Sequence, residues 1–321
     1  MQSTDYPNYF HETLPPYRCG RSHPAAMLLT ILMIMTGCAM APGHSSDHTG
    51  SPVSPYQPGD IIHAQSGKIV SFETLIEDLA SVKIVYVGEQ HNNADHHTIQ
   101  TQVIRALQER HSSLKIGMEM FDRSYQRILD EWSSGSLERQ AFIEKSHWYA
   151  NWKYDFGLYA GILDIISEYR IPLIALNIPF HIPAKIAVGG LDNLRPEERR
   201  YLPNKIDTAN ADHRAYVKSV HDQHQIPGRE NFEFFYSAQC VWEDAMAEAV
   251  AGHLAGGPMI VLAGNGHIVR KFGIPDRVFS RSGASYRTIY PLIDGQQVDA
   301  SYGDYIWITP KPSRFNLKKH T

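Results

Sequence analysis

Two apolar runs, far apart in the chain, end in the same way. Residues 84–87 lead into a glycine, Glu89 and His91, and residues 259–263 lead into glycines and His267. A continuous aliphatic run of this length predicts a buried strand of a parallel sheet. Open α/β sheets place their ligands at the carboxyl ends of such strands. We therefore expect the three polar side chains to meet at one edge of one sheet.

The rest of the chain alternates between strand-like and helix-like patterns. This alternation predicts an α/β fold with a mainly parallel sheet and helices on both faces. A short hairpin before residue 71 and two runs after residue 286 supply further strands. The strands are expected at residues 60–63, 68–70, 84–89, 115–120, 171–177, 259–263, 287–293 and 305–309, and the main helices at 71–80, 95–110, 125–132, 158–170 and 239–254.

Residues 181–236 break the alternation. They contain prolines at 183, 196, 203 and 227 and only short polar helical segments. Such a stretch is typical of an insertion laid over a sheet, because prolines end helices and cannot lie in central strands. We expect one α/β domain over residues 59–321 with a helical insertion at 181–236.

The first residues form a different kind of sequence. Two arginines precede an apolar stretch at 25–35, and small residues then lead directly into Cys38. A positive flank, a short apolar segment and a small-residue cleavage site predict an export signal. The segment resembles a bacterial lipoprotein signal, which makes residues 1–37 the signal peptide and Cys38 the lipidated mature terminus. A plain secretory signal is the alternative, with the cysteine a bystander.

The predicted location is the bacterial cell envelope, with a lipid-anchored protein facing the periplasm. Residues 38–58 are rich in Ser, Pro, Gly and His and are expected to form a flexible tether between anchor and domain. With the signal removed and Cys38 acylated, Cys240 is left without an internal disulfide partner. The net charge of −4 provides no cationic excess to neutralise phosphates, which argues against nucleic acid as a partner.

Glu89 and His91 both suit metal coordination and acid–base chemistry. His96 and His97 follow in the first turn of the next helix, where Asn93 or Asp95 could cap the free amides. The positive end of the helix dipole disfavours protonation there, which favours neutral imidazoles. The alternative is that these histidines only satisfy hydrogen bonds at the start of the helix.

Two further polar residues end expected strands. Glu119 lies at the end of an apolar run, and Asn177 ends the next strand along the chain. A buried carboxylate needs a partner, and His91 or His267 would serve. The alternative partners are the local bases Arg123 and Lys115.

A set of short motifs occurs in order along residues 82–278. The motifs are Gly88-Glu89-Gln90-His91, His96-His97 with Gln100, Glu119-Met120-Phe121, Ile174-Ala175 with Asn177, Ala238-Gln239 with Trp242, Met246-Ala247, and Ala263-Gly264 with Gly266-His267. The set resembles the ChaN-like haem-binding lipoprotein family, which is related to Tiki-type proteins. The resemblance implies an envelope lipoprotein linked to iron acquisition, with haem held between two protomers through a tyrosine ligand and with histidine and lysine groups at the propionates.

Haem needs a broad apolar and aromatic surface with cationic anchors, and tyrosinate is a recognised ligand of ferric haem. The insertion supplies Tyr216 as the preferred ligand, with His213, Lys218 and Tyr201 as further candidates. The alternative is that these aromatic side chains only pack. The polar stripe of helix 239–254, which includes Glu243 and Asp244, is expected to face solvent, although the resemblance assigns its first member, Gln239, a supporting role at the site.

The leading hypothesis is a haem-binding envelope lipoprotein that forms a homodimer when loaded with haem, and it is favoured over an enzyme. The main rival is a metal-dependent hydrolase similar to Tiki-type peptidases. In that case Glu89, His91 and His267 would hold a divalent metal ion and Glu119 would act as general base. His96, His97, Asn177 and Gln239 would support the site. A structural lipoprotein with no working site is the third alternative.

Overall fold

The structure is a computed structural model that describes residues 55–224 and 227–312. The predicted signal peptide, Cys38 and most of the predicted tether lie outside these residues. Cys240, the one cysteine among the described residues, is buried. No helix in this part of the chain is both long and apolar enough to cross a membrane.

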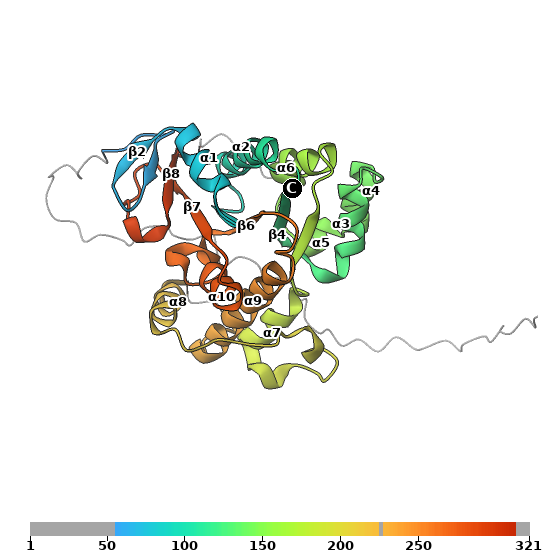
Figure 1. The fold of residues 1–321 in the computed structure, drawn as a ribbon. Helices are drawn as coiled ribbons and strands as arrows, with labels where there is room; N and C mark the ends of the chain where they lie inside the picture. The colour runs from blue at the N-terminus through green and yellow to red at the C-terminus, as the bar shows by residue number, and fades with distance from the viewer. Residues whose placement is uncertain (1–54, 225–226, 313–321) are drawn as a thin grey trace, which may run out of the picture. The chain divides into compact units, whose positions relative to one another are not determined.

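The described residues form an eight-stranded sheet in the order β2-β1-β8-β7-β3-β6-β4-β5 (Figure 1). The pairs β8·β7, β7·β3, β3·β6, β6·β4 and β4·β5 are parallel, whereas β1 runs antiparallel to both β2 and β8. The predicted α/β fold with a mainly parallel sheet is therefore confirmed. The strands are β1 (Ile61–His63), β2 (Lys68–Val70), β3 (Ile84–Glu89), β4 (Lys115–Asp122), β5 (Leu173–Asn177), β6 (Met259–Gly264), β7 (Tyr286–Ile293) and β8 (Tyr305–Thr309).

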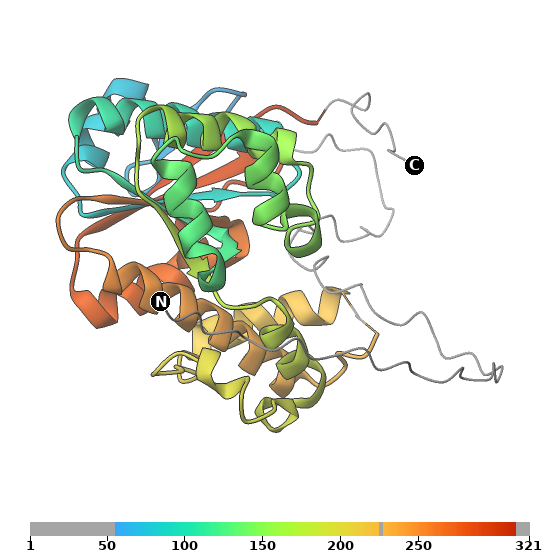
Figure 2. The same cartoon turned by 90° about the vertical axis from the view of Figure 1, so that its right-hand side faces the viewer.

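Helices cover both faces of the sheet, because alternate residues of each buried strand point to opposite faces. On one face, Val85 and Val87 of β3 pack with apolar residues of α1, α2, α3 and α6. On the other face, Ile84 and Tyr86 pack against α9 and α10. Figures 1 and 2 show these two helical layers with the sheet between them. The helices are α1 (Phe72–Ala80), α2 (Ala94–Arg110), α3 (Gln126–Ser133), α4 (Arg139–Lys145), α5 (Trp148–Asn151), α6 (Phe156–Glu168), α7 (His181–Gly189), α8 (Ala211–His224), α9 (Phe232–Gly252) and α10 (Ile274–Ser282).

The predicted insertion contains α7, α8 and short 3-10 turns, including η3 (Arg199–Tyr201). The expected helix start at residue 239 is wrong, because α9 begins at Phe232 and so includes the last residues of the predicted insertion. Asn231 caps α9 by accepting hydrogen bonds from the amides of Glu233 and Phe234. This cap starts the helix about two turns earlier than the apolar pattern alone predicts.

The register of the central strands positions the candidate site. Glu89, the last residue of β3, lies opposite Gly264, the last residue of β6. Both strands run in the same direction, so the loops that carry His91 and His267 leave the sheet at the same edge. The short turn η4 (Asn265–His267) follows β6 directly and turns His267 back toward that edge.

Candidate functional site

Glu89 lies at the centre of a hydrogen-bonded group at this edge. Its Oε1 is 2.7 Å from His91 Nδ1 and accepts a hydrogen bond of 2.5 Å from the Tyr159 hydroxyl. Its Oε2 accepts one of 2.8 Å from Gln100 Nε2. Burial alone would raise the pKa of Glu89, but the charges and hydrogen bonds of His97 and His91 outweigh burial and hold that pKa well below its ordinary value. The ionised carboxylate therefore fixes His91 with Nδ1–H toward Glu89, which leaves Nε2 on the side of Gly264.

Glu119 forms the second acidic position at the edge. Its Oε2 accepts a hydrogen bond of 2.6 Å from the Gly264 amide, and its Oε1 lies 3.5 Å from His267 Nε2. Asn177 donates its side-chain amide to the Glu119 carbonyl at 2.9 Å. Burial would raise the pKa of Glu119, yet the charge of His267 lowers it. The predicted pairing of Glu119 with a histidine is thus confirmed, and the local bases are paired elsewhere.

His267 bridges two buried carboxylates. Its Nε2 faces Glu119 and its Nδ1 lies 3.4 Å from Glu243 Oε1. Burial opposes the charged form, but Glu119 and Glu243 outweigh burial and raise the pKa of His267 to about 10. Gln239 supports the pair, because its Nε2 donates to Glu243 Oε1 at 2.7 Å and lies 3.2 Å from His267 Nδ1. The edge therefore holds an imidazolium between two carboxylates.

The expectation that Glu243 and Asp244 face solvent is wrong. Both are fully buried. Arg277 of α10 donates from Nε to Glu243 at 3.3 Å and from a terminal nitrogen to Asp244 at 2.5 Å. Burial would raise the pKa of Glu243, but the charge and hydrogen bond of His213, together with His267 and Arg277, outweigh burial and hold that pKa well below its ordinary value. The sequence did contain a signal, since this stripe lies in a helix that is apolar on nearly every other side, which indicates a buried helix.

His96 and His97 hold the loop that carries His91. The Gln90 amide donates to His96 Nδ1 at 2.8 Å, and burial lowers the pKa of His96 to about 3, so this imidazole is neutral as expected. His97 Nε2 lies 3.5 Å from Glu89 Oε2, and its ring packs on Tyr159 with centroids 4.3 Å apart. Asn93 caps α2, which decides between the two predicted caps.

The predicted metal set of Glu89, His91 and His267 gains no support. Within residues 55–224 and 227–312, no group of three or more His, Cys, Asp or Glu side chains is arranged to hold a metal ion. Glu89 pairs with His91 while Glu119 and Glu243 pair with His267.

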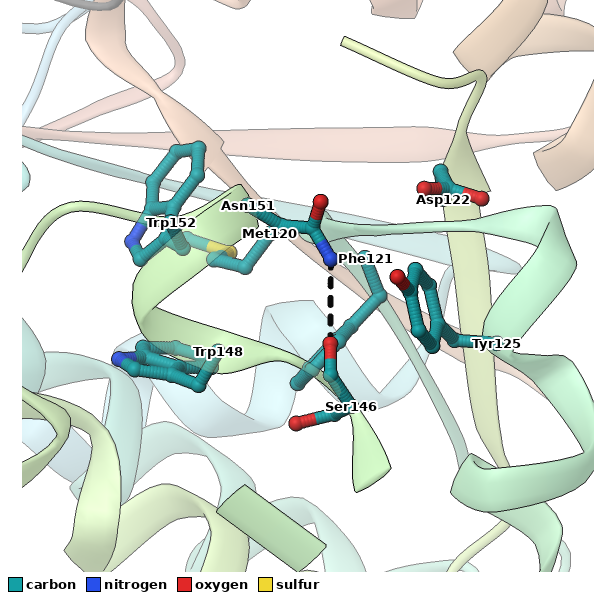
Figure 3. Close-up of a pocket in the computed structure, with 8 residues that line it drawn as sticks. All are labelled: Met120, Phe121, Asp122, Tyr125, Ser146, Trp148, Asn151 and Trp152. Carbon is teal, nitrogen blue, oxygen red and sulfur yellow. Dashed lines mark hydrogen bonds between the residues drawn. The ribbon is translucent and has the colours of Figure 1, made fainter. Parts of the chain in front are cut away.

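Aromatic rings surround the two histidines. The ring centroid of Trp152 lies 4.8 Å from that of His91, and the centroid of Trp242 lies 5.2 Å from that of His267. Phe180 packs between the two indoles, at 5.9 Å from Trp152 and 6.3 Å from Trp242. Trp152 also lines a narrow hollow at the end of β4. Figure 3 shows this hollow, where Asn151 donates a hydrogen bond to the Ser146 carbonyl.

The structure separates the candidate haem residues of the insertion. His213 is buried, with its Nε2 3.2 Å from Glu243 Oε2, so it belongs to the carboxylate network and cannot reach a surface ligand. Tyr201 packs in a cluster with other insertion residues, and its hydroxyl accepts a hydrogen bond from Arg200. Lys218 is exposed on α8 and pairs with Asp222. These three residues therefore do not converge on one pocket with Tyr216.

Tyr216 lies where α8 packs against residues of β7 and β8. It is half-buried and lines a small hollow of about 10 Å³ with Gln239 and three apolar side chains. Its ring centroid lies 6.5 Å from that of Phe272, and it packs against an apolar cluster that includes Tyr290 and Tyr302. No local pattern in the sequence predicts these three aromatic neighbours, because they come from segments 56 to 86 residues further along the chain.

A basic and aromatic stripe lies on another face of α8, because Arg214, Lys218 and His221 recur at intervals of three or four residues, whereas Tyr216 is two residues from both Arg214 and Lys218. Arg214 lies over the Phe232 ring at 4.8 Å and Lys218 lies over the same ring at 5.5 Å. His221 packs against Phe232 with ring centroids 5.5 Å apart. Aromatic rings with cationic side chains fit a flat, apolar, anionic molecule such as haem. The Tyr216 hollow is far smaller than the roughly 300–1,000 Å³ of sites that enclose ligands of this size, so it cannot enclose such a ligand.

Comparisons with known proteins agree with the fold. Residues 75–278 match the family described as haem-binding uptake, Tiki superfamily, ChaN. A structure of cofacial heme binding to ChaN of Campylobacter jejuni is similar, with a TM-score of 0.65, 19% identity, and coverage of 79% of this chain and 98% of that chain. The type III effector HopBA1 has a TM-score of 0.45 at 13% identity, covering 75% of this chain and 93% of that chain. An erythromycin esterase EreC mutant has a TM-score of 0.44 at 15% identity, covering 74% of this chain and 76% of that chain. No curated protein matches the chain significantly by sequence.

Proposed function

Because the chain belongs to the ChaN haem-binding uptake family of the Tiki superfamily, we propose that it binds ferric haem in the bacterial cell envelope and serves haem or iron acquisition. The observation that carries the proposal is Tyr216, a half-buried tyrosine that packs beside Phe272 on α8, the helix whose other face carries the basic stripe. It combines an anionic oxygen ligand, an aromatic surface and cationic side chains on one helix.

Each residue has a distinct part in this proposal. Bound haem would supply a ferric centre, for which tyrosinate oxygen is a suitable ligand. Tyr216 on α8 would provide that oxygen, and packing against Phe272 holds the Tyr216 ring in place. Lys218 and Arg214 would attract the propionates, and Phe232 beneath them would provide apolar contact. His213 keeps α8 attached to α9 through Glu243.

A second protomer would complete the site. The hollow beside Tyr216 is too small to enclose a macrocycle, so one face of the haem would remain exposed to water. Burying that face against a second copy of the chain removes apolar area from water and favours association. Haem binding to the Campylobacter ChaN is cofacial. We propose a homodimer that forms on haem loading.

Anchoring completes the proposed role. The segment before Cys38 supports acylation at that residue, and the following residues through 58 would let the domain stand away from the membrane. A lipid-anchored haem protein facing the periplasm could pass haem to transport proteins without diffusing away.

A haemin titration followed by absorption tests haem binding. Tyr216→Phe should weaken binding of ferric haem and change its spectrum, because the ligand oxygen is lost. Tyr169→Phe is the matched control, since Tyr169 is exposed at the end of α6. Equal binding and identical spectra for wild type and Tyr216→Phe would remove Tyr216 from the site. Size-exclusion chromatography of the same samples should show the haem-loaded wild type at the size of a dimer.

Hydrolysis at the sheet edge is the second candidate function. The observation that favours it is that Glu89 fixes the orientation of His91. Tyr159 and Gln100 hold Glu89 in place by donating hydrogen bonds to its carboxylate. An imidazole oriented in this way is suited to act as a general base. In the described structure, the indole N–H of Trp242 has no hydrogen-bond partner and could donate to a carbonyl oxygen. Turnover of a panel of esters and peptides that disappears in His91→Gln would support this function, and its absence in wild type would exclude it for that panel.

A further inference from the structure

A polar hollow of about 480 Å³ lies at the other end of the parallel strands from Glu89. It is formed where the first residues of β7 and β8 meet the end of β1 and the turn η5 (Val269–Lys271). Its volume falls within the range of small-molecule sites in proteins. The lining side chains are three bases, one acid and small or polar residues: His63, Lys271, Arg287, Asp304, Ala64, Gln65, Ala300, Ser301 and Gly303.

The basic side chains keep donors available after their internal pairing. Lys271 Nζ donates to Asp304 at 2.7 Å. Arg287 donates from Nε and one terminal nitrogen to Asp78 at 2.7 and 2.9 Å, and from its other terminal nitrogen to the Tyr286 carbonyl at 3.1 Å. An ammonium and a guanidinium each carry more N–H groups than these bonds use. The single lining acid, Asp304, is already satisfied, because it also accepts from the Thr288 amide at 2.9 Å and hydroxyl at 3.1 Å.

The backbone that delivers Lys271 is strained. Arg270 and Lys271 are consecutive non-glycine residues with φ of 53° and 66°. Left-handed conformations are unfavourable for such residues, and they persist where surrounding contacts enforce them, often at ligand sites. Two ion pairs enforce this turn, Arg270 with Asp299 at 3.1 Å and Lys271 with Asp304 at 2.7 Å. The strained turn therefore holds the Lys271 ammonium at the wall of the hollow.

We propose that this hollow is a second binding site, separate from the haem surface, for a small molecule that carries an oxyanion group. Lys271, Arg287 and the imidazole of His63 bind the carboxylate or phosphate oxygens. His63 is held for this by its Nδ1 contact of 2.9 Å with Ser66 and by packing on Tyr305 at 5.3 Å. The hollow is larger than one oxyanion, so the ligand carries further polar atoms.

Isothermal titration of the full chain in detergent tests the site, with citrate and inorganic phosphate as the two probes. Ala300→Glu adds a carboxylate at an exposed lining position without removing any existing bond. Lys271→Met removes one cation. The matched control is Lys185→Met, because Lys185 is likewise paired with an acid, Glu198, at 2.7 Å and is 33% exposed against 36% for Lys271.

Wild type is expected to bind one probe, and both hollow variants are expected to bind it roughly tenfold more weakly, since one charge-assisted hydrogen bond contributes about that factor. Lys185→Met and haem-loaded wild type should bind it as unloaded wild type does. Tighter citrate binding assigns an organic acid, and tighter phosphate binding assigns a phosphorylated compound. The proposal is overturned if neither probe binds at millimolar concentration, if Ala300→Glu binds unchanged, or if haem loading abolishes binding.

Discussion

Replacing His267 by glutamine should destabilise the fold strongly, and the loss should depend on pH. His267 is fully buried between Glu119 and Glu243, with carboxylate oxygens at 3.5 and 3.4 Å. A neutral glutamine leaves two buried carboxylates without their shared cation. Breaking a buried ion pair by removing one partner costs about 3–5 kcal/mol. The change in pKa from an ordinary 6.5 to about 10 corresponds to a similar figure, on the order of 5 kcal/mol.

The sign of the pH dependence follows from the raised pKa. The folded protein holds the His267 proton more tightly than the unfolded chain does. The stabilisation is therefore fully present below pH 6.5, decreases as pH rises above that value, and is lost as pH passes about 10. The difference between wild type and His267→Gln should thus be largest near pH 6 and small near pH 10.

Urea unfolding at both pH values measures this difference. The midpoint of the variant should fall without a change in the slope m, which would show that stability and not compactness has changed. His253→Gln serves as the control, because that histidine is exposed at the end of α9 and should change stability by no more than about 0.5 kcal/mol. A loss below about 1 kcal/mol for His267→Gln, or a loss of equal size at both pH values, would refute the reasoning.

Three further outcomes are expected. Cys38→Ser should release the protein from the membrane fraction or leave an unprocessed precursor. A variant that stays in the membrane fraction and is processed as wild type is would contradict acylation. Gly264→Ala should cost about 1–3 kcal/mol in thermal unfolding, because the new Cβ would lie 2.9 Å from the buried His91 ring, whereas Gly252→Ala meets nothing within 4 Å and should not destabilise. Asn231→Ala should cost about 1 kcal/mol by uncapping α9, and helix content that begins to melt at the same temperature as in wild type would argue against this cap.

The residues that meet at the edge of the sheet can be predicted from the sequence, because this prediction does not depend on the order of the strands. Any two parallel strands in one sheet deliver their last residues to the same edge, so Glu89, Glu119 and His267 are predicted together and lie together. Which carboxylate pairs with which histidine depends on register and on the turn η4. The apolar pattern contains no information about either.

Other residues cannot be placed from the sequence because their environment is set by distant segments. The otherwise apolar pattern of its own helix indicates that Glu243 is buried, but not that Arg277 and His213 are the residues that cover it. Tyr216 is a candidate on the composition of its insertion, yet Phe272, Tyr290 and Tyr302 form much of its surroundings. Conversely, composition also favours His213 as a haem residue, and burial against α9 excludes it.

The central claim is that Tyr216 ligates ferric haem, and resonance Raman spectroscopy of the haem-loaded full chain tests it most directly. Wild type should show phenolate vibrations that shift when the protein carries ring-deuterated tyrosine, because the ligand is a tyrosinate oxygen. These vibrations should be absent from Tyr216→Phe and retained in Tyr169→Phe. Phenolate vibrations that persist in Tyr216→Phe, or a wild-type spectrum of histidine-ligated haem, would contradict the assignment.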